Sequence, residues 1–160
     1  MLVAVAALAV ATIVVVVVAR SDGDASDRAD EVAARGREVM PFDLERTTHV
    51  FAPTASGGIQ TVVADEPGDT EQVAVIRSHL REEIERFTVG DFGDPAAIHD
   101  DDMPGLAVLE AEHESLDASY RDVADGGEIT YRSTDLVVVA ALHEWFEAQL
   151  SDHGSHAQAG

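Results

Sequence analysis

The stretch Thr134-Asp-Leu-Val-Val-Val-Ala-Ala-Leu-His-Glu-Trp-Phe-Glu-Ala-Gln-Leu150 has the spacing of an amphipathic helix. At about 100° per residue, one stripe of that helix carries Leu136, Val139, Phe146 and Leu150. His143 falls inside the stripe, and Glu147 lies at its edge one turn later. Because a buried ionisable group needs a partner, this pair is the most informative feature of the chain.

An earlier helix repeats the pattern. Pro67-Gly-Asp-Thr-Glu-Gln72 supplies an N-cap followed by acidic residues, and His79 and Glu83 lie at the flank of the apolar stripe that follows. The spacing Thr-x8-His-x3-Glu occurs in both helices, starting at Thr70 and at Thr134. The stripe of the earlier helix consists of Val73, Ile76, Leu80, Ile84 and Phe87.

A hairpin is predicted before each of these helices. Residues 47–52 and 59–64 flank Ser56-Gly-Gly58, and residues 116–123 and 128–132 flank Ala124-Asp-Gly-Gly127. The order predicts an α+β fold of two pseudo-duplicated ββα units. These would form a four-stranded antiparallel sheet with two helices on one face, in addition to an N-terminal hydrophobic helix.

The N-terminus is apolar. Residues 2–19 contain a single polar side chain, Thr12, and as a helix would span about 27 Å, close to the thickness of a bilayer core. They predict either a transmembrane signal-anchor or a signal peptide, for which Val17-Val-Ala19 is an acceptable cleavage site. We therefore divide the chain into this segment (1–19), a charged linker (20–38), the α+β domain (39–154) and a flexible tail (155–160).

The sequence is compatible with two orientations of the domain relative to the membrane. No Lys or Arg precedes the apolar segment, whereas Arg20, Arg28, Arg35 and Arg37 follow it, and the positive-inside rule would then keep the domain in the cytoplasm. Export is the commoner use of such an N-terminus, so we expect a membrane-anchored protein with an extracytoplasmic domain.

The charge of the chain excludes several partners. A net charge of -21, with ten Arg and no Lys, argues against binding to nucleic acid or to anionic lipid. Acidic residues spread along the whole chain are typical of a halophilic protein, in which high salt screens the repulsion. The absence of Cys rules out disulfides and thiolate ligands.

Histidine and carboxylate side chains suggest a metal site. At a spacing of i, i+4, His79–Glu83 and His143–Glu147 could each share a metal ion, or each could be a buried structural pair. The loop His99-Asp-Asp-Asp-Met-Pro-Gly105 adds an imidazole and the thioether of Met103, which suit copper, zinc or iron, or else oxygens for a harder ion. We regard His49 and His153 as outer candidates.

Three stretches carry a resemblance: Met40-Pro-Phe-Asp-Leu-Glu-Arg-Thr-Thr-His-Val-Phe51, Ile98-His-Asp-Asp-Asp-Met-Pro-Gly105 and Leu142-His-Glu-Trp-Phe-Glu-Ala-Gln-Leu-Ser-Asp-His-Gly154. They resemble a family of small bacterial and haloarchaeal proteins often labelled aspartate carbamoyltransferase. The resemblance implies a discrete domain over roughly residues 40–154, and no activity. The enzyme of that name is a longer two-domain protein with a Ser-Thr-Arg-Thr phosphate-binding stretch, which Arg132-Ser-Thr134 does not match.

Signatures of enzymes are missing from the sequence, which has no phosphate-binding Gly-rich loop, nucleophile elbow or His-Glu-x-x-His motif. We expect a domain that binds or senses a metal ion or a small ligand. The alternative is a protein-interaction module whose histidines are structural, and an enzyme is the least favoured reading. The oligomeric state does not follow from the sequence.

Overall fold

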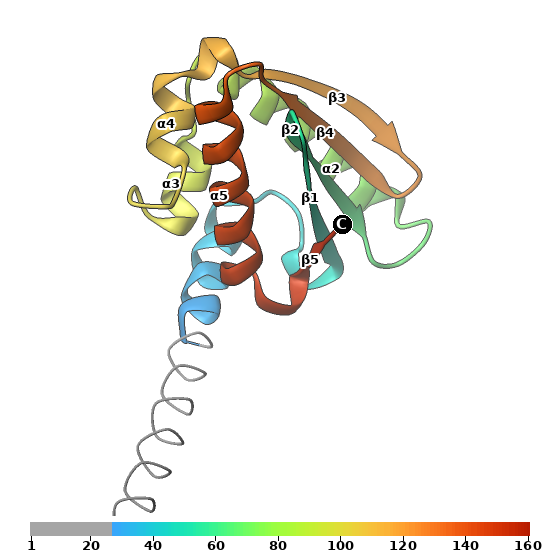
Figure 1. Ribbon diagram of the computed structural model, residues 1–160. Coiled ribbons are helices and arrows are strands. Elements are labelled where there is room, and N and C mark those ends of the chain that lie inside the picture. Colours follow the sequence, from blue (N-terminus) through green and yellow to red (C-terminus); the bar gives the residue numbers. More distant parts are fainter. Residues whose placement is uncertain (1–26) are drawn as a thin grey trace, which may run out of the picture.

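A twisted five-stranded sheet forms the centre of the structure, and two long helices pack on one of its faces (Figure 1). The computed structural model describes residues 27–160. The elements are a helix over residues 27–39, η1 Leu44–Arg46, β1 Thr47–Thr54, β2 Gly57–Ala64, α2 Thr70–Phe87, α3 Gly93–His99, α4 Leu106–Ala111, η2 His113–Ser115, β3 Asp117–Val123, β4 Gly126–Arg132, α5 Leu136–Asp152, η3 Gly154–His156 and β5 Ala157–Ala159.

The strand order is β3-β4-β2-β1-β5. The four long strands pair antiparallel, but β5 runs parallel to β1, with His49 opposite Ala157. The prediction of a four-stranded antiparallel sheet was therefore wrong, because the end of the chain returns to the free edge of β1 and pairs with it. Three shorter helices, at residues 27–39, α3 and α4, also accompany the two predicted ones.

The two long helices lie against the same face of the sheet. A methyl group added at Gly58 on β2 would lie 2.4 Å from the ring of Phe146 on α5, and one at Gly127 on β4 would lie 2.8 Å from Leu80 on α2. Both contacts need a residue without a side chain, since the helices approach the strands too closely for a Cβ atom. The shared core is rich in aromatic rings: Phe51, Phe87, Phe92, Tyr131, Trp145 and Phe146.

Helix α5 buries a different stripe from the one predicted. Its N-cap, Asp135, accepts a hydrogen bond from the backbone N–H of Val137. The first turn then extends beyond the sheet, so that Leu136 is 78% exposed. Trp145, the largest buried side chain, faces the core and fixes the rotation of the helix. The buried face is therefore Val138, Val139, Ala141, Leu142, Trp145, Phe146, Gln149 and Asp152.

Both ends of the described chain join the domain. Residues 27–39, expected to lie in a charged linker, form a helix that buries Val32. Residues 155–160, expected to form a flexible tail, contain η3 and β5 instead. The apolar segment 2–19 lies outside the described residues. Within residues 27–160, no helix is both long enough and apolar enough to cross a bilayer.

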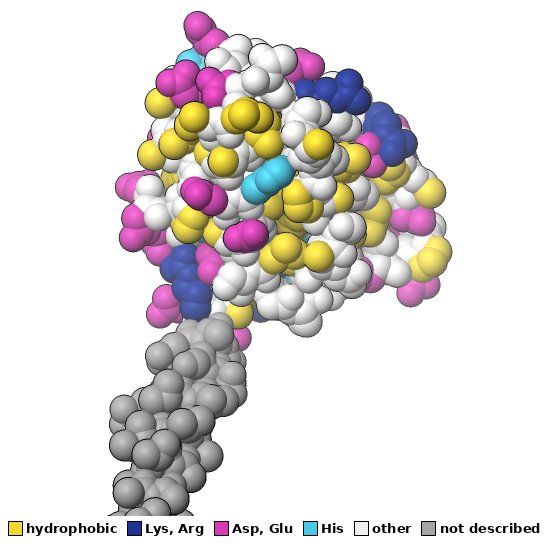
Figure 2. Space-filling model, in the orientation of Figure 1, with side chains coloured by type: hydrophobic (Ala, Val, Ile, Leu, Met, Phe, Trp, Pro, Cys, Tyr) yellow, Lys and Arg dark blue, Asp and Glu magenta, His cyan; other side chains and the backbone are white. Residues whose placement is uncertain are grey.

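Acidic side chains are scattered over the visible surface rather than gathered in one patch (Figure 2). On this face, the distribution agrees with general solvation in high salt.

A glycine at the start of α4 gives a test of the packing between α4 and α5. Gly105 has a φ of 79°, and a Cβ atom there would lie 2.0 Å from the carbonyl oxygen of Ala141 on α5. Gly68 has a similar φ of 84°, but a Cβ there would meet nothing within 4 Å. We expect Gly105→Ala to lower the free energy of unfolding by roughly 3–5 kcal/mol, whereas Gly68→Ala pays only for backbone strain, about 1 kcal/mol. Urea denaturation in molar salt measures both, and equal losses would contradict this account.

Candidate functional site

Four histidines from four different elements line one small cavity beneath the sheet. His49 lies on β1, His79 on α2, His99 at the end of α3 and His153 directly after α5. The cavity has a volume of about 20 Å³, which is enough for one water-sized occupant. Four segments that are distant in sequence thus bring their imidazole rings to one place in the fold.

His79 faces a carboxylate on its own helix. Its Nε2 lies 3.5 Å from Oε1 of Glu83, and both residues are buried. Burial by itself lowers the pKa of His79, but the carboxylate of Glu83 outweighs burial and raises that pKa above its ordinary value. The pair is therefore an ionic one, in which proximity to Glu83 favours the charged imidazolium.

His99 is paired with a carboxylate from another helix. Its Nδ1 lies 2.9 Å from Oδ2 of Asp152, the last residue of α5. Burial alone would raise the pKa of Asp152, but His99 and Arg28 lower it below the usual range, so the carboxylate is ionised. Because an ionised carboxylate only accepts, Nδ1 of His99 carries the proton, and in the neutral ring Nε2 is left with a lone pair.

His49 and His153 form a stacked pair. Their ring centroids are 5.2 Å apart and their planes differ by 8°, while His153 also makes an edge contact of 4.9 Å with His99. Burial, together with the neighbouring imidazoles, lowers the pKa of His49 to about 4 and that of His153 to about 2. Both rings are therefore neutral at pH 7. Nε2 of His153 donates to Oε1 of Gln149 at 2.9 Å, which leaves its Nδ1 as an acceptor.

Three buried nitrogen atoms around the cavity have no hydrogen-bond partner in the described part of the chain: Nδ1 of His49, Nε2 of His79 and Nε1 of Trp145. A buried polar atom without a partner costs about 1–3 kcal/mol. These three residues all line the same cavity, so a small polar or ionic occupant could contact them together.

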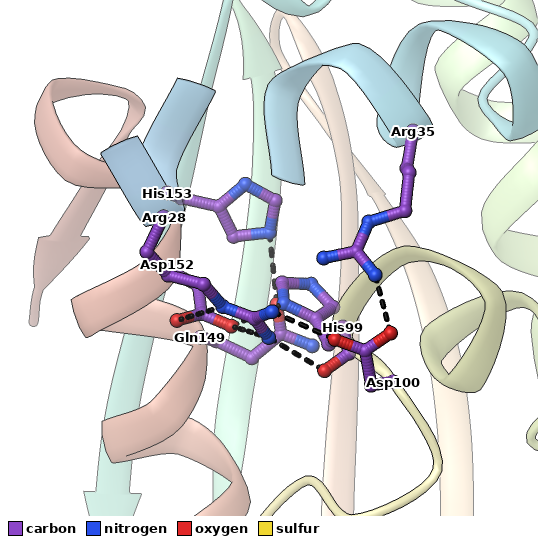
Figure 3. A network of polar contacts seen from close by, with 7 residues as sticks. All are labelled: Arg28, Arg35, His99, Asp100, Gln149, Asp152 and His153. Carbon is purple, nitrogen blue, oxygen red and sulfur yellow. Dashed lines mark hydrogen bonds and ion pairs between the residues drawn. The ribbon is translucent and has the colours of Figure 1, made fainter. Parts of the chain in front are cut away.

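An ion-pair network joins the site to the N-terminal helix (Figure 3). The guanidinium of Arg28 donates to Oδ2 of Asp152 at 3.0 Å, to the backbone oxygen of His99 at 2.6 Å and to Oδ2 of Asp100 at 2.7 Å. Arg35 pairs with the other oxygen of Asp100. Asp100 itself has a φ of 74°, an unusual backbone conformation for a residue with a side chain.

The remaining predicted residues lie elsewhere. His143 is half-buried, and its Nε2 donates to the backbone oxygens of Thr54 and Gly57, at 3.1 and 2.8 Å, where it holds the turn between β1 and β2. Glu147 is exposed and makes no pair with His143 among the described residues. Met103 is buried in the core cluster and also lines a separate groove beside His99.

Of the six predicted metal ligands, the structure thus brings three to the cavity: His79, Glu83 and His99. His49 and His153, treated as outer candidates, are central. The sequence pattern does not single out Gln149 or Arg28, whereas Asp152 directly precedes His153 and that proximity is a usable signal. Nothing in the sequence pointed to Arg28, since it lay in a segment interpreted as a linker.

Within residues 27–160, no three His, Cys, Asp or Glu side chains are already arranged to hold a metal ion. Comparison of the chain with protein-family models, with curated proteins and with solved structures gave no match. The site has therefore to be interpreted from its own geometry.

The lowered pKa of His49 predicts acid sensitivity. Between pH 6.5 and about 4 the unfolded chain binds a proton at this position that the folded chain does not, so stability falls as the pH falls through that window. The full loss is on the order of 3 kcal/mol for one such group. His79, whose pKa is raised, acts in the opposite sense only above pH 6.5, where its contribution is lost as the pH rises.

We expect His49→Gln to reduce the dependence of unfolding free energy on pH between 4 and 6.5, as measured by urea denaturation in molar salt, while His153, whose pKa is also lowered, retains part of the slope. His143→Gln, outside the cavity, should retain the slope of the natural chain. Identical slopes in all three proteins would show that His49 is not held neutral by the fold.

Proposed function

We propose that the domain binds a first-row transition-metal ion, copper or zinc, in the histidine-lined cavity. The observation that carries the proposal is the convergence of four imidazoles on a space for a single small occupant, where Nδ1 of His49 has no hydrogen-bond partner among the described residues and Nε2 of His79 faces only Glu83, at 3.5 Å. Imidazole nitrogen is the commonest ligand for these ions in proteins.

The protonation states favour this chemistry. A metal ion binds the neutral imidazole, and the low pKa values of His49 and His153 keep both rings neutral at pH 7. Asp152 holds Nδ1–H of His99, the arrangement in which a carboxylate orients an imidazole so that Nε2 can bind a metal. Met40 also lines the cavity, and its thioether would suit copper.

The charges near the cavity also suit a cation. Glu83 and Asp152 each carry a carboxylate beside the histidines, whereas Arg28 is the one arginine that contacts Asp152 within residues 27–160. A divalent ion would displace the proton shared in the His79–Glu83 pair and leave Glu83 to balance its charge. Because the donors are not yet in ligand geometry, binding would require rotation of the rings of His49 and His79.

Metal analysis of the full-length chain tests the proposal. We expect one copper or zinc ion per chain and an increase in thermal stability when the ion is added. His49→Ala and His99→Ala should lose at least about tenfold in affinity, in line with the loss of a ligand or its orientation. His143→Ala is the matched control, because that imidazole lies outside the cavity, and it should bind normally. A chain that neither retains metal nor gains stability would show instead that the cavity holds water and the histidines are structural.

We also propose that the domain is held at a membrane or exported by residues 2–19, which lie outside the described residues. Val10→Asp places a charge in the middle of this apolar segment, at a cost of about 2.5–3.5 kcal/mol for insertion. We expect this variant to leave the membrane fraction in alkaline extraction, while Ser21→Asp remains there. A mature chain beginning near Arg20 in mass spectrometry would identify a cleaved signal peptide, and equal membrane retention of both variants would contradict anchoring by this segment.

A protein-interaction module is the second candidate. It is supported by two large apolar side chains at the start of α5, Leu136 and Val137, which are 78% and 63% exposed. A negative metal analysis, together with reduced self-association in sedimentation experiments when both residues are replaced by Ser, would support the interaction module.

A further inference from the structure

We propose that the helix over residues 27–39 is a lid on the histidine-lined cavity, latched by Arg28 on the carboxylate that holds His99. The inference rests on the proposed function for the identity of the occupant, since it concerns regulation of access to the same site. The covering of the cavity can be tested without any metal.

The position of the lid helix follows from the space around His49 and His153. Both residues line the inner cavity, and both also line a second space of about 210 Å³ that faces the helix. The opposite wall of that second space is made by Ala29, Ala33 and Arg37 of the helix. A small occupant could therefore reach the stacked imidazoles along the surface that the helix covers.

Few apolar contacts hold the lid helix in place. Its only large apolar residues are Val32, which is buried, and Val39, which is partly buried. The other strong contacts are ionic, and they concentrate at Arg28 and Arg35. Segments with little apolar burial open at a free energy well below that of global unfolding. The lid helix can thus separate from a domain that remains folded.

Asp152 connects the lid to the site. Its Oδ2 accepts from Arg28 at 3.0 Å and lies 2.9 Å from Nδ1 of His99, so one carboxylate oxygen serves both the helix and the cavity. Arg28 also binds the backbone oxygen of His99 at 2.6 Å. A change at His99 that weakens or strengthens its hydrogen bond to Asp152 therefore changes the ion pair between Asp152 and Arg28. By thermodynamic linkage, release of Arg28 must change the free energy of binding at His99 by the same amount.

The lid helix is also the first described element after the apolar segment 2–19. A latch at this place would link occupancy of the site to the part of the chain nearest that segment.

Modification of histidines by diethyl pyrocarbonate, which acylates accessible neutral imidazole, tests the lid in the full-length protein at molar salt. We expect Arg28→Gln to raise the modification rates of His49 and His153 about tenfold, because the population of the open form grows when charged hydrogen bonds are lost. Asp152→Asn should have a similar effect, and Arg28→Lys a smaller one, since it keeps the charge without the forked geometry.

Two controls isolate the latch. Glu31→Gln removes a charge from an exposed position of the same helix that lines neither space, and it should leave the rates unchanged. His143 in every variant reports on the fold, because its ring lies outside the cavity, and its rate should stay constant. Equal rates for His49 in Arg28→Gln and in the natural chain, or an equal rise in Glu31→Gln, would overturn the lid.

A second arm adds Zn²⁺ to the natural chain and to Arg28→Gln. Protection of His49 and His153 by Zn²⁺, weaker in Arg28→Gln, supports the coupling of the lid to the site. The same protection at the same Zn²⁺ concentration in both proteins overturns that coupling. If Zn²⁺ and Cu²⁺ protect neither protein while the lid variants respond as expected, the metal proposal fails and the lid stands.

Discussion

The carboxylate of Asp152 is the group on which the arrangement of the site depends. It sits at the end of α5 with little exposure, and an ion in such a place needs partners that replace its hydration. Those partners are Arg28, near the start of the described chain, and His99, at the end of α3. The carboxylate of Asp152 thus holds together the helix over residues 27–39, α3 and the end of α5.

The environment divides the four histidines into two kinds. His79 and His99 each face a carboxylate, whereas His49 and His153 face each other and other rings. The carboxylate of Glu83 favours the imidazolium of His79, and burial among rings favours the neutral imidazole at His49 and His153. The cavity can hold a cation at His79 only if that ring gives up its proton. Binding and proton release are therefore linked at this site.

The sequence predicts the α+β class because each hairpin and each long helix has its own local signals. These signals are the periodicity of the apolar residues, the turn residues and the capping residues. The fifth strand, and the packing of residues 27–39 against the domain, were missed for the opposite reason. β5 is only three residues long and pairs with the free edge of β1, while residues 27–39 carry only two large apolar side chains and are held by Arg28. The rotation of α5 was also misjudged, since Trp145, and not the stripe containing His143, determines which face is buried. Contacts made by distant charges leave no periodic signal.

At position 28, the geometry of the side chain explains why the residue is an arginine and not a lysine. High salt weakens exposed ion pairs, so a latch that is to hold at molar salt needs geometry as well as charge. The planar guanidinium meets this need, because its nitrogens reach Asp152, Asp100 and the backbone oxygen of His99 at once. A lysine ammonium is a point charge and could not hold three acceptors in fixed directions. The same fork ties the orientation of His99 to the position of the helix, so that neither can change without the other.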